Sequence, residues 1–77
     1  MNSITDAASY LIKAILPPEA KVEVNTREEN GTIIIEITAM SEYIGQLIGK
    51  EGKIIKSIRT LLNLSFPDQK YLLEIKE

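Results

Sequence analysis

Two glycines three residues apart, Gly49 and Gly52, interrupt a long run of helix-periodic residues. Apolar side chains recur at helical spacing before the pair, at Ile44, Leu47 and Ile48, and after it, at Ile54, Ile55, Ile58, Leu61 and Leu62. The pattern predicts a helix, a four-residue turn and a second helix. Glycine tolerates positive φ and has no side chain, so another backbone can approach such a turn closely. The second helix would also direct unpaired N–H groups and the positive end of its dipole there, which predicts an anion-binding turn suited to phosphates.

The wider stretch resembles the motif of the KH domain, an RNA-binding module whose GxxG loop clamps about four nucleotides of backbone. The resemblance rests on the pattern Ile44-Gly45-x-x-Ile48-Gly49-Lys50-Glu51-Gly52-x-x-Ile55, followed by Ile58-Arg59. Over its whole length the chain resembles the small, single-domain bacterial KH proteins of the KhpA type. The resemblance therefore implies one KH domain over residues 1–77, with its GxxG loop at 49–52.

The first predicted element is an amphipathic helix. Ser3 is a suitable N-cap with Asp6 three residues on, and Pro17-Pro18 ends the helical pattern. The apolar stripe consists of Ile4, Ala7, Ala8, Leu11, Ile12 and Ile15. Only one cation, Lys13, lies on the polar face, so we expect core packing rather than binding to anionic lipid.

Two strands follow, over 21–27 and 32–38, each with an alternation of period two. The segment Glu28-Glu29-Asn30-Gly31 joins them, and Asn-Gly is a strong hairpin signal. Ile33, Ile35 and Ile37 point to one face of the predicted pair. Ile34 falls on the other face, where we expect it to be either a lone exposed apolar residue or part of a partner contact.

The remaining elements are two helices and a strand. Ser41 is a candidate cap for a helix over 42–48, a helix runs from Lys53 to about Leu64, and a last strand covers 70–76. The predicted order is α-β-β-α-α-β in a single α+β domain. This is the order of the prokaryotic, type II KH domain, which the resemblance implies as a three-stranded sheet with helices packed on one face.

The composition leaves little room for catalysis. The chain of 77 residues has no cysteine and no histidine, so it lacks thiolate nucleophiles, the usual zinc ligands and the commonest general base. Gly45 precedes Gly49 too closely for a P-loop, and Glu51 stands where a magnesium-binding hydroxyl is needed. We therefore expect no enzyme, no catalytic residues, no metal and no cofactor.

The location is expected to be the cytoplasm. The first residues lack the basic region and the unbroken apolar run of a signal peptide. No stretch of the sequence approaches the eighteen apolar residues that suggest a membrane span, so we expect no membrane partner.

The charges are unevenly distributed along the chain. The net charge is −2, yet residues 46–60 carry +3, from Lys50, Lys53, Lys56 and Arg59 against Glu51, so the rest of the chain carries −5. An acidic body with one basic stripe would orient a polyanion at a single place. The alternative is that these cations only form the solvated face of a helix.

The resemblance assigns roles to the residues around the loop. Lys50 and Lys53 would neutralise phosphates, and Lys56 and Arg59 would extend the track. Ile44, Ile48 and Ile55 would line an aliphatic groove for the bases, although their helical spacing also suits a purely structural role in the core. Glu51 departs from the family pattern, whose loops are often basic, and places a carboxylate beside the phosphate path.

The resemblance also implies partners. KhpA-like proteins bind single-stranded RNA, form homodimers through the face near the GxxG helices, and pair with a second KH protein of the KhpB (Jag) type. They act as RNA chaperones or in post-transcriptional control linked to cell elongation, division and shape. The competing interpretation is a KH-fold module for protein contacts with little or no RNA binding, which Glu51 and the acidic balance favour.

Overall fold

The computed structural model describes residues 3–76. Its elements follow the predicted order α-β-β-α-α-β, with two short 3₁₀ turns added. In chain order they are α1 (Ile4–Ile15), η1 (Pro18–Ala20), β1 (Glu23–Glu29), β2 (Thr32–Thr38), α2 (Ser41–Ile48), η2 (Lys50–Gly52), α3 (Lys53–Ser65) and β3 (Tyr71–Lys76). The predicted fold class, a three-stranded α+β domain, is confirmed.

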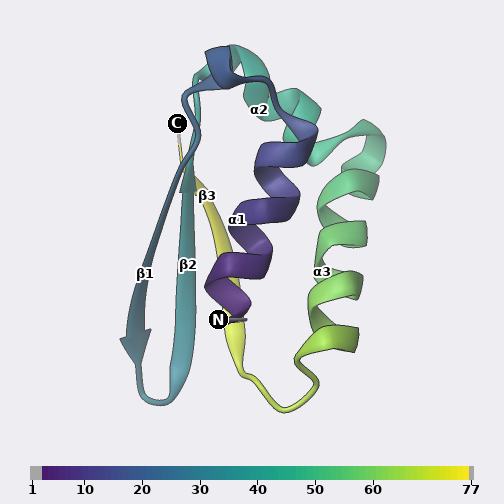
Figure 1. Cartoon of the computed structure of the whole chain (residues 1–77). Coiled ribbons are helices and arrows are strands. Elements are labelled where there is room, and N and C mark those ends of the chain that lie inside the picture. The colour runs from purple at the N-terminus through teal and green to yellow at the C-terminus, as the bar shows by residue number, and fades with distance from the viewer. Residues whose placement is uncertain (1–2, 77) are drawn as a thin grey trace.

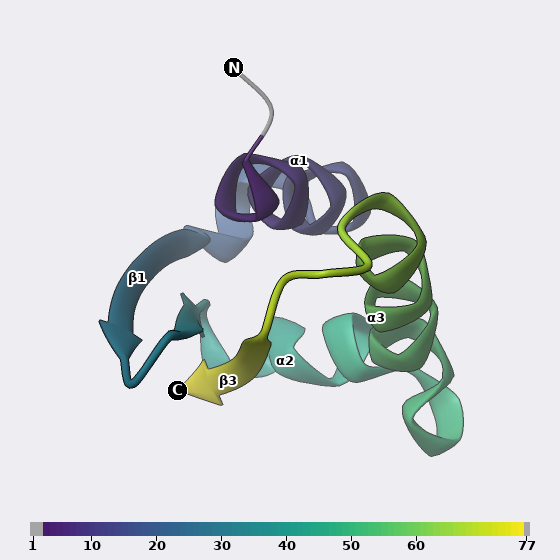
Figure 2. The same ribbon diagram turned by 90° about the horizontal axis from the view of Figure 1, so that it is seen from below.

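The three strands form one mixed sheet in the order β1-β2-β3. The β1 and β2 strands are antiparallel, whereas β2 and β3 are parallel and need a crossover, which α2 and α3 supply. Figure 1 shows α2 crossing one end of the sheet and α3 running back beside α1. The view from below in Figure 2 shows α1 and α3 on the same side of the sheet, as expected. The core between the layers is aliphatic and includes Ile12, Ile35, Ile37, Leu47 and Leu62.

The β1–β2 hairpin is tighter than the sequence suggested. Asn30 and Gly31 both have positive φ, 52° and 81°, as a two-residue type I′ turn requires. Glu29 pairs with Thr32, so β1 continues to Glu29 and the predicted four-residue turn is too long. The strand also begins two residues later than predicted, because Lys21 adopts a left-handed conformation after η1.

Helix α1 packs its apolar stripe on the sheet. The Asp6 N–H donates to Ser3 Oγ at 3.1 Å, which confirms the predicted N-cap. One member of the predicted stripe, Ile15, is exposed, and Leu16 is buried in its place. The reason is local: the chain leaves the helix after Ile15, and the extended backbone of Leu16 turns its side chain inward.

The predicted cap of α2 is also wrong. Ser41 is the first residue of the helix, and Met40 occupies the N-cap position without a side-chain hydrogen bond. The Met40 N–H donates to the carbonyl of Ala20 at 2.8 Å. This bond to η1, remote in sequence, sets where the helix begins.

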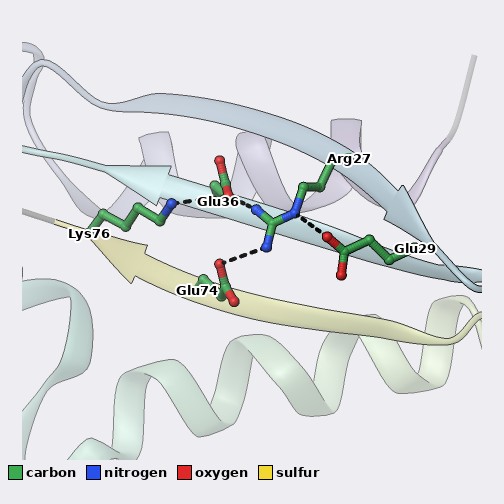
Figure 3. A network of polar contacts seen from close by, with 5 residues as sticks. All are labelled: Arg27, Glu29, Glu36, Glu74 and Lys76. Atoms are coloured by element: carbon green, nitrogen blue, oxygen red, sulfur yellow. Dashed lines mark hydrogen bonds and ion pairs between the residues drawn. The ribbon is translucent and has the colours of Figure 1, made fainter.

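The face of the sheet away from the helices carries a network of ion pairs (Figure 3). Arg27 Nε lies 3.0 Å from Glu29 Oε2, and the same guanidinium contacts Glu36 and, at 3.7 Å, Glu74 Oε1. Lys76 Nζ lies 3.1 Å from Glu36 Oε2. Because Glu36 and Glu74 are register partners on neighbouring strands, Arg27 offsets a repulsion between two carboxylates and links all three strands.

Ile34 lies on this outer face and is only 6% exposed, so the expectation of an exposed residue is wrong. Its register partners are Arg27 on β1 and Leu72 on β3. Long side chains on both neighbouring strands can cover a central-strand residue without a helix above it, because the stem of an arginine packs on apolar surface while its charge stays in water.

Tyr71 links β3 to α3 by hydrogen bonds. Its hydroxyl lies 2.8 Å from Asn63 Oδ1 and donates to the carbonyl of Arg59 at 3.1 Å. Burial raises the pKa of the Tyr71 phenol above its usual value of 10.0, and the nearby Arg59 charge partly opposes this shift. The folded state therefore favours the neutral phenol.

Replacement of Tyr71 by Phe should lower the free energy of unfolding by about 1 kcal/mol, because it removes hydrogen bonds while the ring keeps its packing. The measurement is urea denaturation followed by far-UV circular dichroism. The matched control is Tyr10→Phe, since Tyr10 is 75% exposed, and this change should stay within about 0.5 kcal/mol. Equal effects of the two changes would contradict the role given to Tyr71.

The Tyr71→Phe variant also tests the pKa shift. With a raised folded-state pKa, the stabilisation from the neutral phenol is complete below pH 10.0 and is lost as the pH rises through the folded-state value. The native chain should therefore lose stability above pH 10.0 more steeply than Tyr71→Phe does.

Candidate nucleic-acid interface

The turn between α2 and α3 is built on Gly49. This residue has φ 78° and ψ 174°, a conformation essentially restricted to glycine, and its N–H donates to the carbonyl of Gly45 at 2.8 Å. A Cβ at this position would lie 2.6 Å from Cγ1 of Ile54. Two separate constraints therefore require glycine at position 49: the backbone conformation, and the close packing of the Ile54 side chain.

The rest of the turn is held by its own backbone. The Gly52 N–H donates to the carbonyl of Gly49 at 3.1 Å, and the Lys53 N–H to that of Lys50. Glu51 and Gly52 both adopt left-handed conformations, with φ 58° and 74°. Helix α3 then begins at Lys53 without a side-chain N-cap, so no side chain covers the N–H groups of its first turn.

Four exposed cations line this turn and the helix that follows, namely Lys50, Lys53, Lys56 and Arg59. None of them takes part in an ion pair among residues 3–76, whereas Arg27 and Lys76 are both paired on the sheet. The first turn of α3 contains no acidic residue, although the helix dipole favours anions there. Among residues 3–76, the cations at this end of α3 are therefore stabilised neither by an ion pair nor by the helix dipole. The same charges attract an external anion.

The three isoleucines expected beside the loop occupy different environments. Ile44 is 8% exposed and belongs to the core, Ile48 is 36% exposed, and Ile55 is half-buried. An aliphatic surface beside the turn can thus be formed by Ile48 and Ile55, whereas Ile44 mainly anchors α2.

Gly45 is a feature of the interface to which the sequence analysis assigned no role. It lies inside α2, is exposed, and a Cβ built on it would meet nothing within 4 Å. Glycine inside a helix costs about 1 kcal/mol relative to alanine. The fold does not need a glycine at position 45. A glycine that lowers helix stability without a structural reason is itself a sequence signal, because the missing side chain lets another molecule approach the backbone closely.

Among residues 3–76, no group of three or more acidic side chains is placed to hold a metal ion. In the same part of the chain, no helix has both the length and the apolar character needed to cross a membrane.

The element order, the mixed sheet and the glycine turn ahead of α3 together define a type II KH domain. The family model described as KhpA/KhpB, KH domain, matches residues 5–75. The chain therefore belongs to the KhpA/KhpB family of KH domains.

Curated relatives agree with this assignment. RNA-binding protein KhpA of Chlamydia caviae is 42% identical over 57 residues, which cover 74% of this chain and 73% of the relative. RNA-binding protein KhpA of Treponema pallidum is 33% identical over 69 residues, covering 87% and 86%. The protein of the same name from Thermotoga maritima is 35% identical over 60 residues, covering 78% and 80%. No solved structure matches the chain significantly.

Alanine at the three glycines should affect stability in a fixed order. Gly49→Ala should lower the free energy of unfolding by about 2 kcal/mol or more, through positive φ and the clash with Ile54. Gly52→Ala should cost about 1 kcal/mol, because its surroundings are open and only φ is unfavourable. Gly45→Ala should instead stabilise by up to about 1 kcal/mol. Chemical denaturation of the three variants measures this order, and a stabilising Gly49→Ala would contradict the geometry.

Proposed function

We propose that this chain binds single-stranded RNA across the Gly49–Gly52 turn. The observation that carries the proposal is the cationic stripe of Lys50, Lys53, Lys56 and Arg59, which has no ion-pair partner among residues 3–76. The stripe begins at the N-terminal end of α3, which has no side-chain cap. The printed names of the KhpA relatives, RNA-binding proteins, support the same function.

In this mechanism the strand meets the turn through its backbone. Phosphates lie against the N–H groups of the first turn of α3, where the helix dipole favours negative charge. Lys50 and Lys53 neutralise the nearest phosphates, and Lys56 and Arg59 extend the track along α3. Bases rest against Ile48 and Ile55, with Ile44 contributing only its exposed edge.

The expected affinity is modest. If about three phosphates are neutralised, log affinity falls with log salt at a slope of roughly −2, and a single module would bind with a dissociation constant on the order of 10⁻⁴ to 10⁻⁶ M. Tyr43, the aromatic residue nearest to the loop in sequence, is half-buried in the core. With little surface for base stacking, sequence preference should be broad.

The test compares two charge-matched double variants by fluorescence anisotropy with a labelled single-stranded RNA of mixed sequence. Lys50→Gln with Lys53→Gln should weaken binding about tenfold or more at low salt and reduce the salt slope by about 1.4, because two phosphate contacts are lost. Lys13→Gln with Lys70→Gln changes the net charge equally at exposed sites outside the stripe, and should leave the slope unchanged. Circular dichroism confirms that both variants fold.

Equal weakening by the two double variants would show that only net charge matters and would reject the clamp. Failure of the native chain to bind this RNA at low salt would favour the competing function, a KH-fold module for protein contacts.

We also propose that the chain acts as a homodimer, with α3 in the contact. Leu61 is half-exposed and Leu64 is 76% exposed on this helix. A groove of about 570 Å³ lies where α3 ends, lined by Ser65 and Phe66 and by Asp6, Ala7 and Tyr10 of α1. Two linked RNA sites raise the effective concentration, which is the physical advantage of assembly for a weak module.

Leu64→Ser should shift the dimer toward monomer in analytical ultracentrifugation, because it removes an exposed apolar side chain that a second copy would cover. The matched control is Leu72→Ser, since Leu72 is also an exposed leucine but lies on the outer face of the sheet. If the native chain were monomeric at all concentrations, the homodimer would be rejected, and the same surface would be assigned to a KhpB-type partner. Mixing the chain with such a protein and measuring sedimentation tests that assignment.

The biological role proposed with this assembly is post-transcriptional control in the cytoplasm, as an RNA chaperone linked to cell elongation, division and shape. No catalytic role is proposed, since RNA binding and assembly account for the features of the interface.

A further inference from the structure

Glu51 has a backbone conformation that is unfavourable for a residue with a Cβ. It has φ 58° and ψ 25°, in the left-handed region that glycine adopts far more readily than a residue with a Cβ. It also places a carboxylate among the cations that would hold phosphates. Both features oppose the function proposed for the turn.

Nothing within the described chain offsets these costs by a direct bond. Glu51 takes part in none of the ion pairs or side-chain hydrogen bonds among residues 3–76, despite lysines on both sides of it in the sequence. It does not cap α3 either, because no side chain donates or accepts a capping bond at that end. The carboxylate therefore remains free to meet a ligand.

The ligand chemistry follows from what a backbone-binding turn can reach. A carboxylate only accepts hydrogen bonds, and phosphate oxygens also only accept. The ribose 2′-hydroxyl is the hydrogen-bond donor of the sugar-phosphate backbone, and single-stranded DNA lacks it. We propose, resting on the RNA-binding function above, that Glu51 accepts a hydrogen bond from a ribose 2′-hydroxyl and makes the turn select RNA over single-stranded DNA.

Selection would arise from two effects of one carboxylate. On RNA, the hydrogen bond to a charged acceptor offsets the repulsion by the neighbouring phosphates. On DNA, the repulsion is left without compensation. The two effects act in the same direction on the affinity ratio, and a hydrogen bond to a charged group is worth about tenfold or more in affinity.

The experiment measures three labelled strands of the same base sequence, one of RNA, one of 2′-fluoro RNA and one of DNA. The 2′-fluoro strand keeps the sugar conformation of RNA but has no 2′ donor, so it separates the hydroxyl from strand shape. Proteins are the native chain, Glu51→Met, which keeps a similar length without charge or oxygen, and Glu28→Met. The last variant makes the same chemical change at an exposed residue of β1, outside the turn.

The native chain should prefer RNA to both other strands by about tenfold, and Glu51→Met should reduce this preference to within about twofold, mainly by tighter binding of the strands without a 2′ donor. Glu28→Met should keep the native ratio. Sedimentation of Glu51→Met should match that of the native chain.

Equal affinity of the native chain for RNA and 2′-fluoro RNA, with Glu51→Met strengthening both alike, would overturn the inference and leave RNA binding intact. A ratio that changes with base sequence instead of with the 2′ group would also overturn it, in favour of a base contact. If Glu51→Met had an altered oligomeric state, the carboxylate would take part in a protein contact, and the inference would be overturned. No RNA binding by the native chain would overturn both this inference and the proposed function.

Discussion

The contact of Ile54 with the backbone of Gly49 is the constraint on which the interface depends. Ile54 also packs against the core, so the core itself holds the conformation of the turn. With Gly49 fixed, the chain leaves α2 and passes through two left-handed residues before α3 begins. The N–H groups at the start of α3 are therefore oriented before any ligand arrives, and a preorganised site loses less conformational entropy on binding.

The two sides of the domain differ in whether their charged side chains form ion pairs. On the sheet, Arg27 and Lys76 neutralise carboxylates that face one another across strands, and this pairing helps β1 and β3 stay with β2. Along α3, the cations have no acidic partner among residues 3–76, and Lys53 begins the helix at the positive end of its dipole. Such an arrangement stabilises the domain at the sheet and leaves positive charge at the turn, where we propose that RNA binds.

The sequence predicted the element types because long periodic stretches determine them, and it predicted the glycine turn and its cations because a local motif carries both. Element ends were less accurate, since they depend on remote contacts such as the hydrogen bond from Met40 to Ala20. The burial of Ile34 depends on side chains from two other strands, which periodicity within one strand does not contain. The contrast between buried Ile44 and exposed Ile48 depends on how α2 sits on the core, which only the folded arrangement provides.

The proposed RNA track and the proposed dimer contact both lie on α3, yet helix geometry separates them. With 3.6 residues per turn, Arg59 and Leu61 differ by about 200° around the axis, so they project from opposite flanks. A strand that follows Lys53, Lys56 and Arg59 moves progressively away from the flank of Leu61. Leu64 shares the outward direction of Lys53, but eleven residues separate them, which is about 16 Å along the axis. One helix can therefore present its first turns to RNA and its last turns to a second copy, so assembly and RNA binding need not compete.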